Sequence, residues 1–214
     1  MKAVLVLEDG SSYQGSFIGT EKDVEGEVVF NTAMTGYQEA LTDPSYRGQI
    51  LVMTYPFIGN TGVNREDAES AAFQPRGLVV REIAKVPSNF RSEISLVEWM
   101  LNKGFPCIEG VDTRALTSRI RRAGSMRGVI SATGSSIAEL AERAKSLPFL
   151  HEQDLIGEVS TPIPYTFAPG DGPTVVVIDF GVKRSILQAL ADKGFRVRVL
   201  PHNTGIAELR REAP

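Results

Sequence analysis

The sequence of 214 residues contains one cysteine, Cys107, and two histidines, His151 and His202. A single thiol excludes an internal disulfide framework and is typical of a reducing compartment, so we expect a cytoplasmic protein. The three side chains are far apart and give no metal-ligand spacing, so no metal site is expected. No apolar run approaches the roughly 20 residues that cross a membrane, and the N-terminus lacks a signal-peptide pattern, so no membrane association is expected.

An excess of positive charge is also missing. The formal net charge is -3, which argues against a general nucleic-acid binder. No aromatic residues interleave with the densest basic region, which further disfavours RNA. A solvated helix face is the ordinary interpretation of this region, and docking on an acidic partner surface is the alternative. The arginines concerned are Arg114, Arg119, Arg121, Arg122 and Arg127.

The first 150 residues mix strand and helix signals. Asp9-Gly10 between two apolar runs predicts a hairpin, because glycine adopts positive φ without steric cost. Predicted strands are 3–7, 13–18, 28–31, 50–55, 77–83 and 126–131. Predicted helices are 92–103, capped by Ser92 with Ile94, Val97 and Leu101 in an apolar stripe, then 112–123, and 136–147 with Ser136 and Glu139 as a capping pair.

The composition changes after residue 150. Residues 160–173 hold four of the chain's twelve prolines, so 151–173 is predicted to be a linker between a domain at 1–150 and a domain at 174–214. TVVVID at 174–179 is predicted as a strand buried on both faces. We then predict a turn at 180–182, a helix at 183–193 with Ile186, Leu187 and Leu190 facing inward, a strand at 195–200 and a helix from Thr204. This order is the opening βαβα of a doubly wound fold.

Two strands cannot form a covered parallel sheet, so their apolar faces need partners. Either the chain is a fragment of a longer protein or another chain supplies the missing strands.

The densest cluster of turn residues lies between two apolar runs, 28–30 and 50–55. It contains TGYQ at 35–38 and TDPSYRG at 42–48, rich in hydroxyl, amide and carboxylate groups. Such groups held between buried strands are a common way to build a small-ligand site. An ordinary hairpin with a long loop is the alternative, and spacing alone favours it.

GEVVFNTAMTGYQEALTDPSY followed by TYPFIGNTGVN resembles the N-terminal domain of the small subunit of carbamoyl phosphate synthetase, the glutamine amidotransferase half of that enzyme. QPRGLVVR at 74–81, SNFR at 88–91, GVDTR at 110–114 and DFGVKR at 179–184 are similar to the same family in the same order. The resemblance implies an α/β fold: a three-layer β/β/α N-terminal domain followed by the start of a class I glutamine amidotransferase domain, which is flavodoxin-like.

The resemblance also implies a function. The small subunit would supply ammonia from L-glutamine to a large subunit, which makes carbamoyl phosphate from bicarbonate and ATP for arginine and pyrimidine synthesis. No cofactor is expected on this chain, since ATP and Mg²⁺ belong to the large subunit. The alternative is a non-catalytic interaction or scaffold module that docks on a synthetase partner.

Ser45 of the Asp-Pro-Ser-Tyr motif and Lys183 of DFGVKR are the glutamine-binding residues that the resemblance implies. The alternatives are local turn capping for Ser45 and a solvated surface position for Lys183. The family's nucleophile is a cysteine, but Cys107 lies in FPCI, which predicts a buried structural strand. His151 is expected in a solvated loop, and His202 has no partner in view. We therefore expect no catalytic residue in this chain and no activity from it in isolation.

Overall fold

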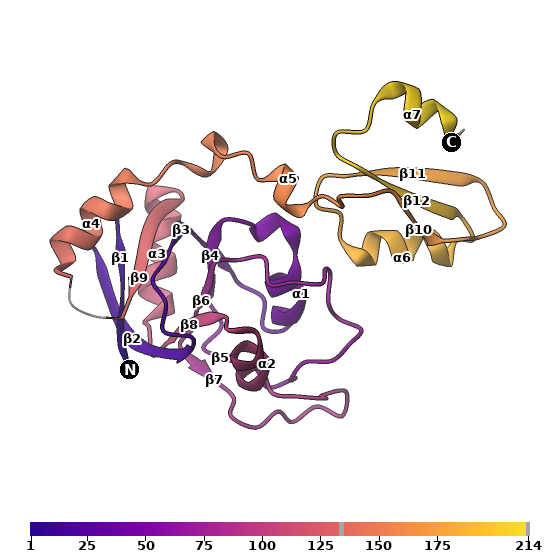
Figure 1. Cartoon of the computed structure of the whole chain (residues 1–214). Coiled ribbons are helices and arrows are strands. Elements are labelled where there is room, and N and C mark those ends of the chain that lie inside the picture. Colours follow the sequence, from indigo (N-terminus) through magenta and orange to yellow (C-terminus); the bar gives the residue numbers. More distant parts are fainter. Residues whose placement is uncertain (133–134, 213–214) are drawn as a thin grey trace. The chain divides into compact units, whose positions relative to one another are not determined.

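The computed structural model describes residues 1–132 and 135–212, and the chain divides into two compact units. The first unit comprises Met1–Thr42 and Tyr46–Gln153, and the second comprises Asp43–Ser45 and Asp154–Pro214 (Figure 1). The segment 151–173, predicted as a linker, contains the short helix α5 (Ile156–Val159) and the strand β10 (Tyr165–Ala168). Positions 133–134 and 213–214 belong to the two predicted domains but lie outside the described residues.

The sheet of the first unit is a closed barrel of seven strands in the order β1-β2-β8-β6-β4-β3-β9. Closure follows because β1 pairs antiparallel with both β2 and β9. The α/β class is thus observed, whereas closure was not predicted. The barrel strands are β1 (Lys2–Leu7), β2 (Ser12–Gly19), β3 (Val24–Asn31), β4 (Gln49–Met53), β6 (Gly77–Val79), β8 (Pro106–Glu109) and β9 (Met126–Ser131); β5 (Phe57–Ile58) and β7 (Glu82–Ile83) form a separate parallel pair.

Alternating side chains divide the core between the two faces of the barrel strands. Leu5, Val52 and Ile108 belong to one fully buried cluster, to which α3 (Thr113–Ala123) contributes its own apolar face. The side chains that alternate with them point to the other face of the sheet, where they contact helices. Such side chains on β4, β6 and β8 pack with α1 (Tyr37–Thr42) and α2 (Leu96–Lys103). Such side chains on β1 and β9 pack with α4 (Ile137–Ser146).

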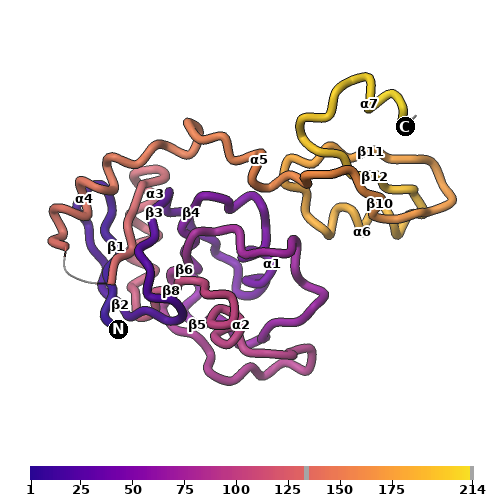
Figure 2. Tube along the Cα trace, viewed as in Figure 1, coloured from indigo at the N-terminus to yellow at the C-terminus, as the bar shows by residue number. Residues whose placement is uncertain are grey.

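The Asp9-Gly10 hairpin between β1 and β2 is confirmed, but the hairpin interpretation of the 28–55 region is wrong. Strands β3 and β4 are parallel, with Val28 opposite Ile50. Parallel neighbours need a crossover rather than a tight turn. Here the crossover contains α1, labelled in Figure 2, and a 3₁₀ turn, η1 (Pro44–Tyr46). The polar cluster thus lies on a structured connection at the ends of two barrel strands.

Helix α2 starts later than predicted. Its N-cap is Ser95, whose hydroxyl accepts from the backbone N–H of Glu98, rather than Ser92. The buried face of α2 is formed by Leu96 and Met100, four residues apart, while Leu101 of the predicted apolar stripe is 56% exposed. The predicted helices at 112–123 and 136–147 are confirmed as α3 and α4, with an Asp112 cap and a Ser136–Glu139 capping box.

The second unit has a three-stranded sheet in the order β10-β12-β11. β11 (Thr174–Asp179) and β12 (Arg196–Pro201) are parallel and joined by α6 (Arg184–Asp192), which confirms the predicted βαβ unit. The antiparallel strand β10 was not predicted. Helix α7 (Ile206–Arg211) follows β12.

Two burial predictions for the second unit are wrong. Helix α6 turns Leu187 to the sheet, 3% exposed, and leaves Ile186 49% exposed. Residues 174–178 of β11 are half-buried rather than buried on both faces. The apolar cluster of the second unit covers one face of its sheet, and among the described elements α6 is the helix that contributes to this cluster.

Gly15 on β2 leaves no room for a side chain. A Cβ there would collide with the carbonyl oxygen of Glu109 and lie 2.7 Å from Ile108 Cγ1. Gly15→Ala is therefore expected to lower the free energy of unfolding by about 2–3 kcal/mol, because the β2–β8 pairing must open to admit the methyl group. Chemical denaturation measures the loss. Gly205→Ala is the matched control, since a Cβ at Gly205 meets nothing within 4 Å, and an equal loss there would contradict the steric explanation.

Candidate functional site

Ser45 lies on the turn after α1. The Asp43 carboxylate accepts a hydrogen bond from the backbone N–H of Ser45 through Oδ1 at 2.9 Å, and the Ser45 residue is exposed. The turn is thus closed by the Asp43 side chain and not by the Ser45 hydroxyl. That hydroxyl stays accessible to solvent, as a ligand-binding group must be.

Lys183 is the N-cap residue of α6, and its ammonium nitrogen Nζ lies 3.5 Å from Asp43 Oδ2 within the second unit. Asp43 therefore contacts both residues that the resemblance implies for glutamine binding. The Lys183 side chain is 40% exposed, so this ion pair alone stabilises the fold only slightly. Sequence reasoning named Ser45 and Lys183 but missed the carboxylate that lies between them.

Asp179 holds the turn that leads to Lys183. This buried carboxylate accepts from the N–H groups of Gly181 and Val182 through Oδ1 and from that of Thr161 through Oδ2, at 2.7–2.9 Å. Gly181 has φ of 93°, a conformation that glycine adopts without strain. An aspartate directly before a Phe-Gly turn was the available signal for this anchor, and sequence reasoning did not use it.

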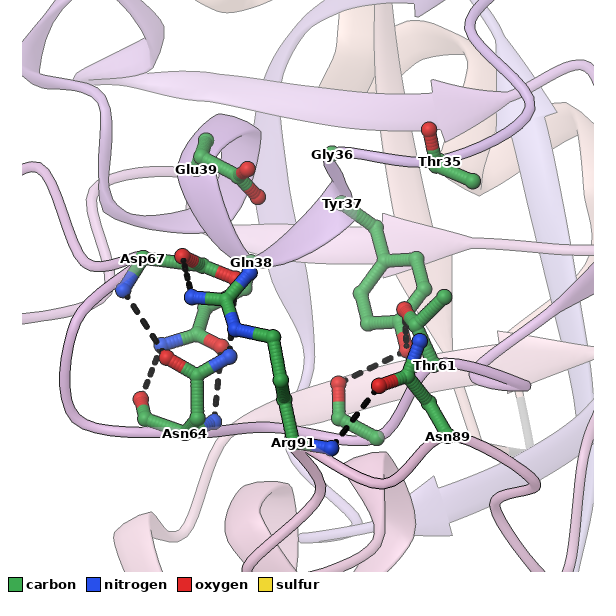
Figure 3. A pocket seen from close by; sticks show the side chains of 11 residues that line it. Thr35, Gly36, Tyr37, Gln38, Glu39, Thr61, Asn64, Asp67, Asn89 and Arg91 are labelled. Carbon is green, nitrogen blue, oxygen red and sulfur yellow. Dashed lines mark hydrogen bonds and ion pairs between the residues drawn. The ribbon is translucent and has the colours of Figure 1, made fainter.

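A polar cavity with a volume of about 250 Å³ lies in the first unit. Figure 3 shows its side chains converging from three segments of the chain. These segments are parts of the motifs that carry the family resemblance: TGYQ, GNTGVN and SNFR. The lining residues are Thr35, Gly36, Tyr37, Gln38, Glu39, Thr61, Gly62, Asn64, Asp67, Asn89 and Arg91.

Hydrogen bonds fix the wall of this cavity. The buried Tyr37 hydroxyl donates to the carbonyl of Gly62 and accepts from the Thr61 hydroxyl, both at 2.7 Å. The Gln38 amide spans the backbone of Asn64, donating to its carbonyl at 2.5 Å and accepting from its N–H at 3.0 Å. Each buried polar group is thereby satisfied, which makes the wall a preorganised surface.

The lining of the cavity holds more acidic than basic side chains. Arg91 donates through Nη2 to Asp67 at 2.6 Å and to Glu66 at 3.0 Å, so this one cation is shared by two carboxylates. Glu39 faces the cavity from α1, and burial, followed by the nearby charges of Asp67 and Glu69, raises the pKa of its carboxyl group despite Arg91. The cavity therefore presents a carboxylate that gains from an added cation.

The remaining candidates are structural or isolated. Cys107 is fully buried in β8, as predicted, and burial raises the pKa of its thiol, which disfavours the reactive thiolate. His151 is exposed and stacks on Phe149. The Nδ1 atom of His202 is buried and has no hydrogen-bond partner among the described residues. Within 1–132 and 135–212, no group of three or more potential metal ligands occurs.

The arginines of the basic region at 114–127 fall into two groups. Arg119 binds Asp9, and Arg127 binds Glu8, so both are structural. Arg114, Arg121 and Arg122 are exposed on α3, which fits the solvated-face interpretation. In the described part of the chain, no helix is long and apolar enough to cross a membrane.

Comparison with known proteins assigns the chain to a family. Residues 5–130 match the family described as carbamoyl-phosphate synthase small chain, CPSase domain. The chain belongs to this family. It is 48% identical over 97% of its length to the carbamoyl phosphate synthase small chain of Listeria innocua, covering 56% of that relative, and 49% identical over 98% of its length to the one of Methanopyrus kandleri, covering 59% of it. The chain thus spans a little over half of the length of these small-chain relatives.

The small-chain relative from Nitratidesulfovibrio vulgaris is 46% identical over 98% of this chain and 60% of its own length. Among solved structures, an aminopeptidase from Aneurinibacillus sp. strain AM-1 aligns with a TM-score of 0.36 and 14% identity over 62% of this chain and 30% of that one. This structural likeness is too low to inform the fold or the function.

Proposed function

We propose that the protein acts as the glutamine-hydrolysing small subunit of carbamoyl phosphate synthetase. The observation that carries this proposal is identity of 48% over 97% of the chain to a carbamoyl phosphate synthase small chain. The ammonia would pass to a large subunit, which binds ATP and Mg²⁺ and forms carbamoyl phosphate from bicarbonate. Both subunits would act in the cytoplasm, and the product would enter arginine and pyrimidine synthesis.

The proposed chemistry is nucleophilic catalysis by a cysteine. A thiolate attacks the side-chain amide carbon of glutamine to form a tetrahedral intermediate. Its C–N bond then breaks as the nitrogen takes up a proton, which releases ammonia and leaves a glutamyl thioester. Water hydrolyses the thioester to glutamate and returns the thiol. Cys107 does not fit this step, because it is fully buried in the barrel sheet. We therefore propose that the 214-residue chain alone does not hydrolyse glutamine and that its residues contribute binding and docking.

The second unit would be the start of a flavodoxin-like class I amidotransferase domain, following a first domain with three β/β/α layers. Its parallel β11-α6-β12 unit supports this proposal, since ligands of such sheets bind beyond the carboxyl ends of the strands. Lys183 lies at that edge, directly after the turn that follows β11. Its ammonium group would bind the α-carboxylate of glutamine, and the Ser45 hydroxyl would donate a hydrogen bond to the same ligand.

A non-catalytic docking module is the second candidate, and the burial of Cys107 favours it for the chain taken alone. The two candidates differ in glutamine binding. Only the glutaminase needs Ser45 and Lys183 to contact the amino acid.

Glutamine binding by the full-length protein tests this assignment. Ser45→Ala and Lys183→Met are each expected to raise the dissociation constant for glutamine, measured by calorimetry, by about tenfold. This is the effect of losing one hydrogen bond or one partly exposed charge pair to a ligand. Lys193→Met, at the other end of α6, is the matched control and should bind as the unmodified protein does. Unchanged affinity in both site variants would remove Ser45 and Lys183 from the glutamine site.

A further inference from the structure

We propose that the 250 Å³ cavity of the first unit is a socket for one lysine or arginine side chain of a protein partner, with the Glu39 carboxylate as its acceptor. The partner we infer is the large synthetase subunit, so this inference rests on the proposed function. It adds the chemistry by which the two chains recognise each other, and it involves neither Ser45 nor Lys183.

The first observation behind the socket is the uncompensated charge. The cavity is lined by Glu39 and Asp67 against the single cation Arg91, and Arg91 already bridges Asp67 and Glu66. Within the described ranges, no lysine or arginine forms an ion pair with Glu39. A carboxylate partly withdrawn from water and surrounded by like charges is destabilised, and an incoming cation would reverse this.

The second observation is two exposed apolar residues that are next in sequence to lining residues of the cavity. Phe90 is 96% exposed and lies between the lining residues Asn89 and Arg91, while Met34 is 61% exposed and precedes the lining residue Thr35. Large exposed apolar side chains beside a polar pocket are typical of protein interfaces. An aromatic residue next to the socket would also contact the aliphatic stem or the charge of a bound lysine or arginine.

The third observation is that the loop carrying Phe90 is held in place. Asn89 accepts from the N–H of Arg91 through Oδ1 at 2.8 Å and from that of Ser92 through its carbonyl at 3.1 Å, and the N–H of Ser88 donates to Asn60 at 2.8 Å. Because the backbone of this loop is already ordered, covering Phe90 costs little loop entropy when a partner binds. Phe90 therefore has the properties of an interface anchor.

The charge of the cavity indicates which kind of ligand it would bind. Its excess of carboxylate groups disfavours anionic ligands such as phosphates and nucleic acids. Its walls are fixed by the hydrogen bonds of Tyr37 and Gln38, which leaves the Glu39 carboxylate as the group available for a new ion pair. A charged side chain from a folded partner fits this combination of exposed apolar residues and an acidic centre.

Association of the full-length protein with the large subunit from the same organism tests the socket. The dissociation constant would be measured by surface plasmon resonance at low and at moderate salt. Glu39→Gln and Phe90→Ala are each expected to weaken association by at least about tenfold, and Glu39→Gln should also reduce the salt dependence, because one ion pair is lost. Glu98→Gln and Leu101→Ala, exposed on α2, are the matched controls and should bind normally.

The outcomes separate the two proposals. Failure of the unmodified protein to bind the large subunit would overturn the proposed partner and the socket together. Normal binding by Glu39→Gln and Phe90→Ala would overturn the socket while the proposed function stands. Weaker binding by Glu39→Gln with an unreduced salt dependence would also overturn it, since an ion pair would not be involved. Unaltered thermal unfolding of each variant shows that the fold is intact.

Discussion

Replacing Arg127 by alanine is expected to lower the free energy of unfolding of the barrel unit by about 3 kcal/mol. Its guanidinium group donates to Glu8 Oε2 from Nε at 2.9 Å and from Nη2 at 2.5 Å, and to the carbonyl of Leu147 from Nη1 at 2.7 Å. It also lies 4.1 Å from the ring centre of Phe149. The Arg127 and Glu8 side chains are only 15% and 21% exposed, so the substitution leaves a poorly solvated carboxylate without a cation.

Denaturant unfolding monitored by the fluorescence of Trp99, which lies in the same unit, measures this loss. Arg127→Lys is the conservative control and should lose part of the stability, because lysine cannot make the bidentate contact. In the double variant with Glu8→Gln the two losses should not add, since the stranded charge is gone. Additive losses would show that the ion pair is not what Arg127 contributes.

Asp179→Ala is expected to destabilise the second unit by roughly 3 kcal/mol. It removes the acceptor of three backbone N–H groups, on Thr161, Gly181 and Val182, and a buried donor left unsatisfied costs about 1–3 kcal/mol. Because this turn places Lys183, glutamine affinity should fall as well. Hydrogen exchange of the β11 and α6 amides measures the stability of this unit separately from the barrel.

Asp179→Asn supplies the matched comparison. Its amide keeps one oxygen acceptor but cannot accept from Thr161 and the 181–182 turn together, so it should lie between the unmodified protein and Asp179→Ala. Faster exchange confined to the second unit is the expected pattern. Unchanged exchange in β11 and α6 would mean that Asp179 does not anchor the turn.

The sequence predicted elements whose signals are local. The Asp9-Gly10 hairpin and the Ser136–Glu139 capping box of α4 each depend on residues a few positions apart, and both are observed. Barrel closure depends instead on pairing between β1 and β9, more than a hundred residues apart. No local pattern encodes such a contact, so an alternating apolar strand does not show which neighbour it will have.

Which face of a helix is buried depends on what packs against it. The sequence offered 94, 97 and 101 as one apolar stripe of α2, whereas the fold buries Leu96 and Met100 and exposes Leu101. The parallel pairing of β3 and β4 was not predicted from spacing, because the helix α1 in their crossover is only six residues long and lies between turn-rich segments at 35–36 and 42–48. The motifs around the cavity were recognised individually, but only the fold brings Glu39, Asn64 and Arg91 to one place.

Glutamine-dependent carbamoyl phosphate synthesis is the most direct test of the proposed function. The full-length protein would be combined with the large subunit of the same organism, bicarbonate, ATP and Mg²⁺, with glutamine or ammonium as the nitrogen source. We expect synthesis from glutamine to require the protein and synthesis from ammonium to proceed without it. A full-length protein that leaves glutamine unused, while the large subunit makes carbamoyl phosphate from ammonium, would contradict the glutaminase assignment.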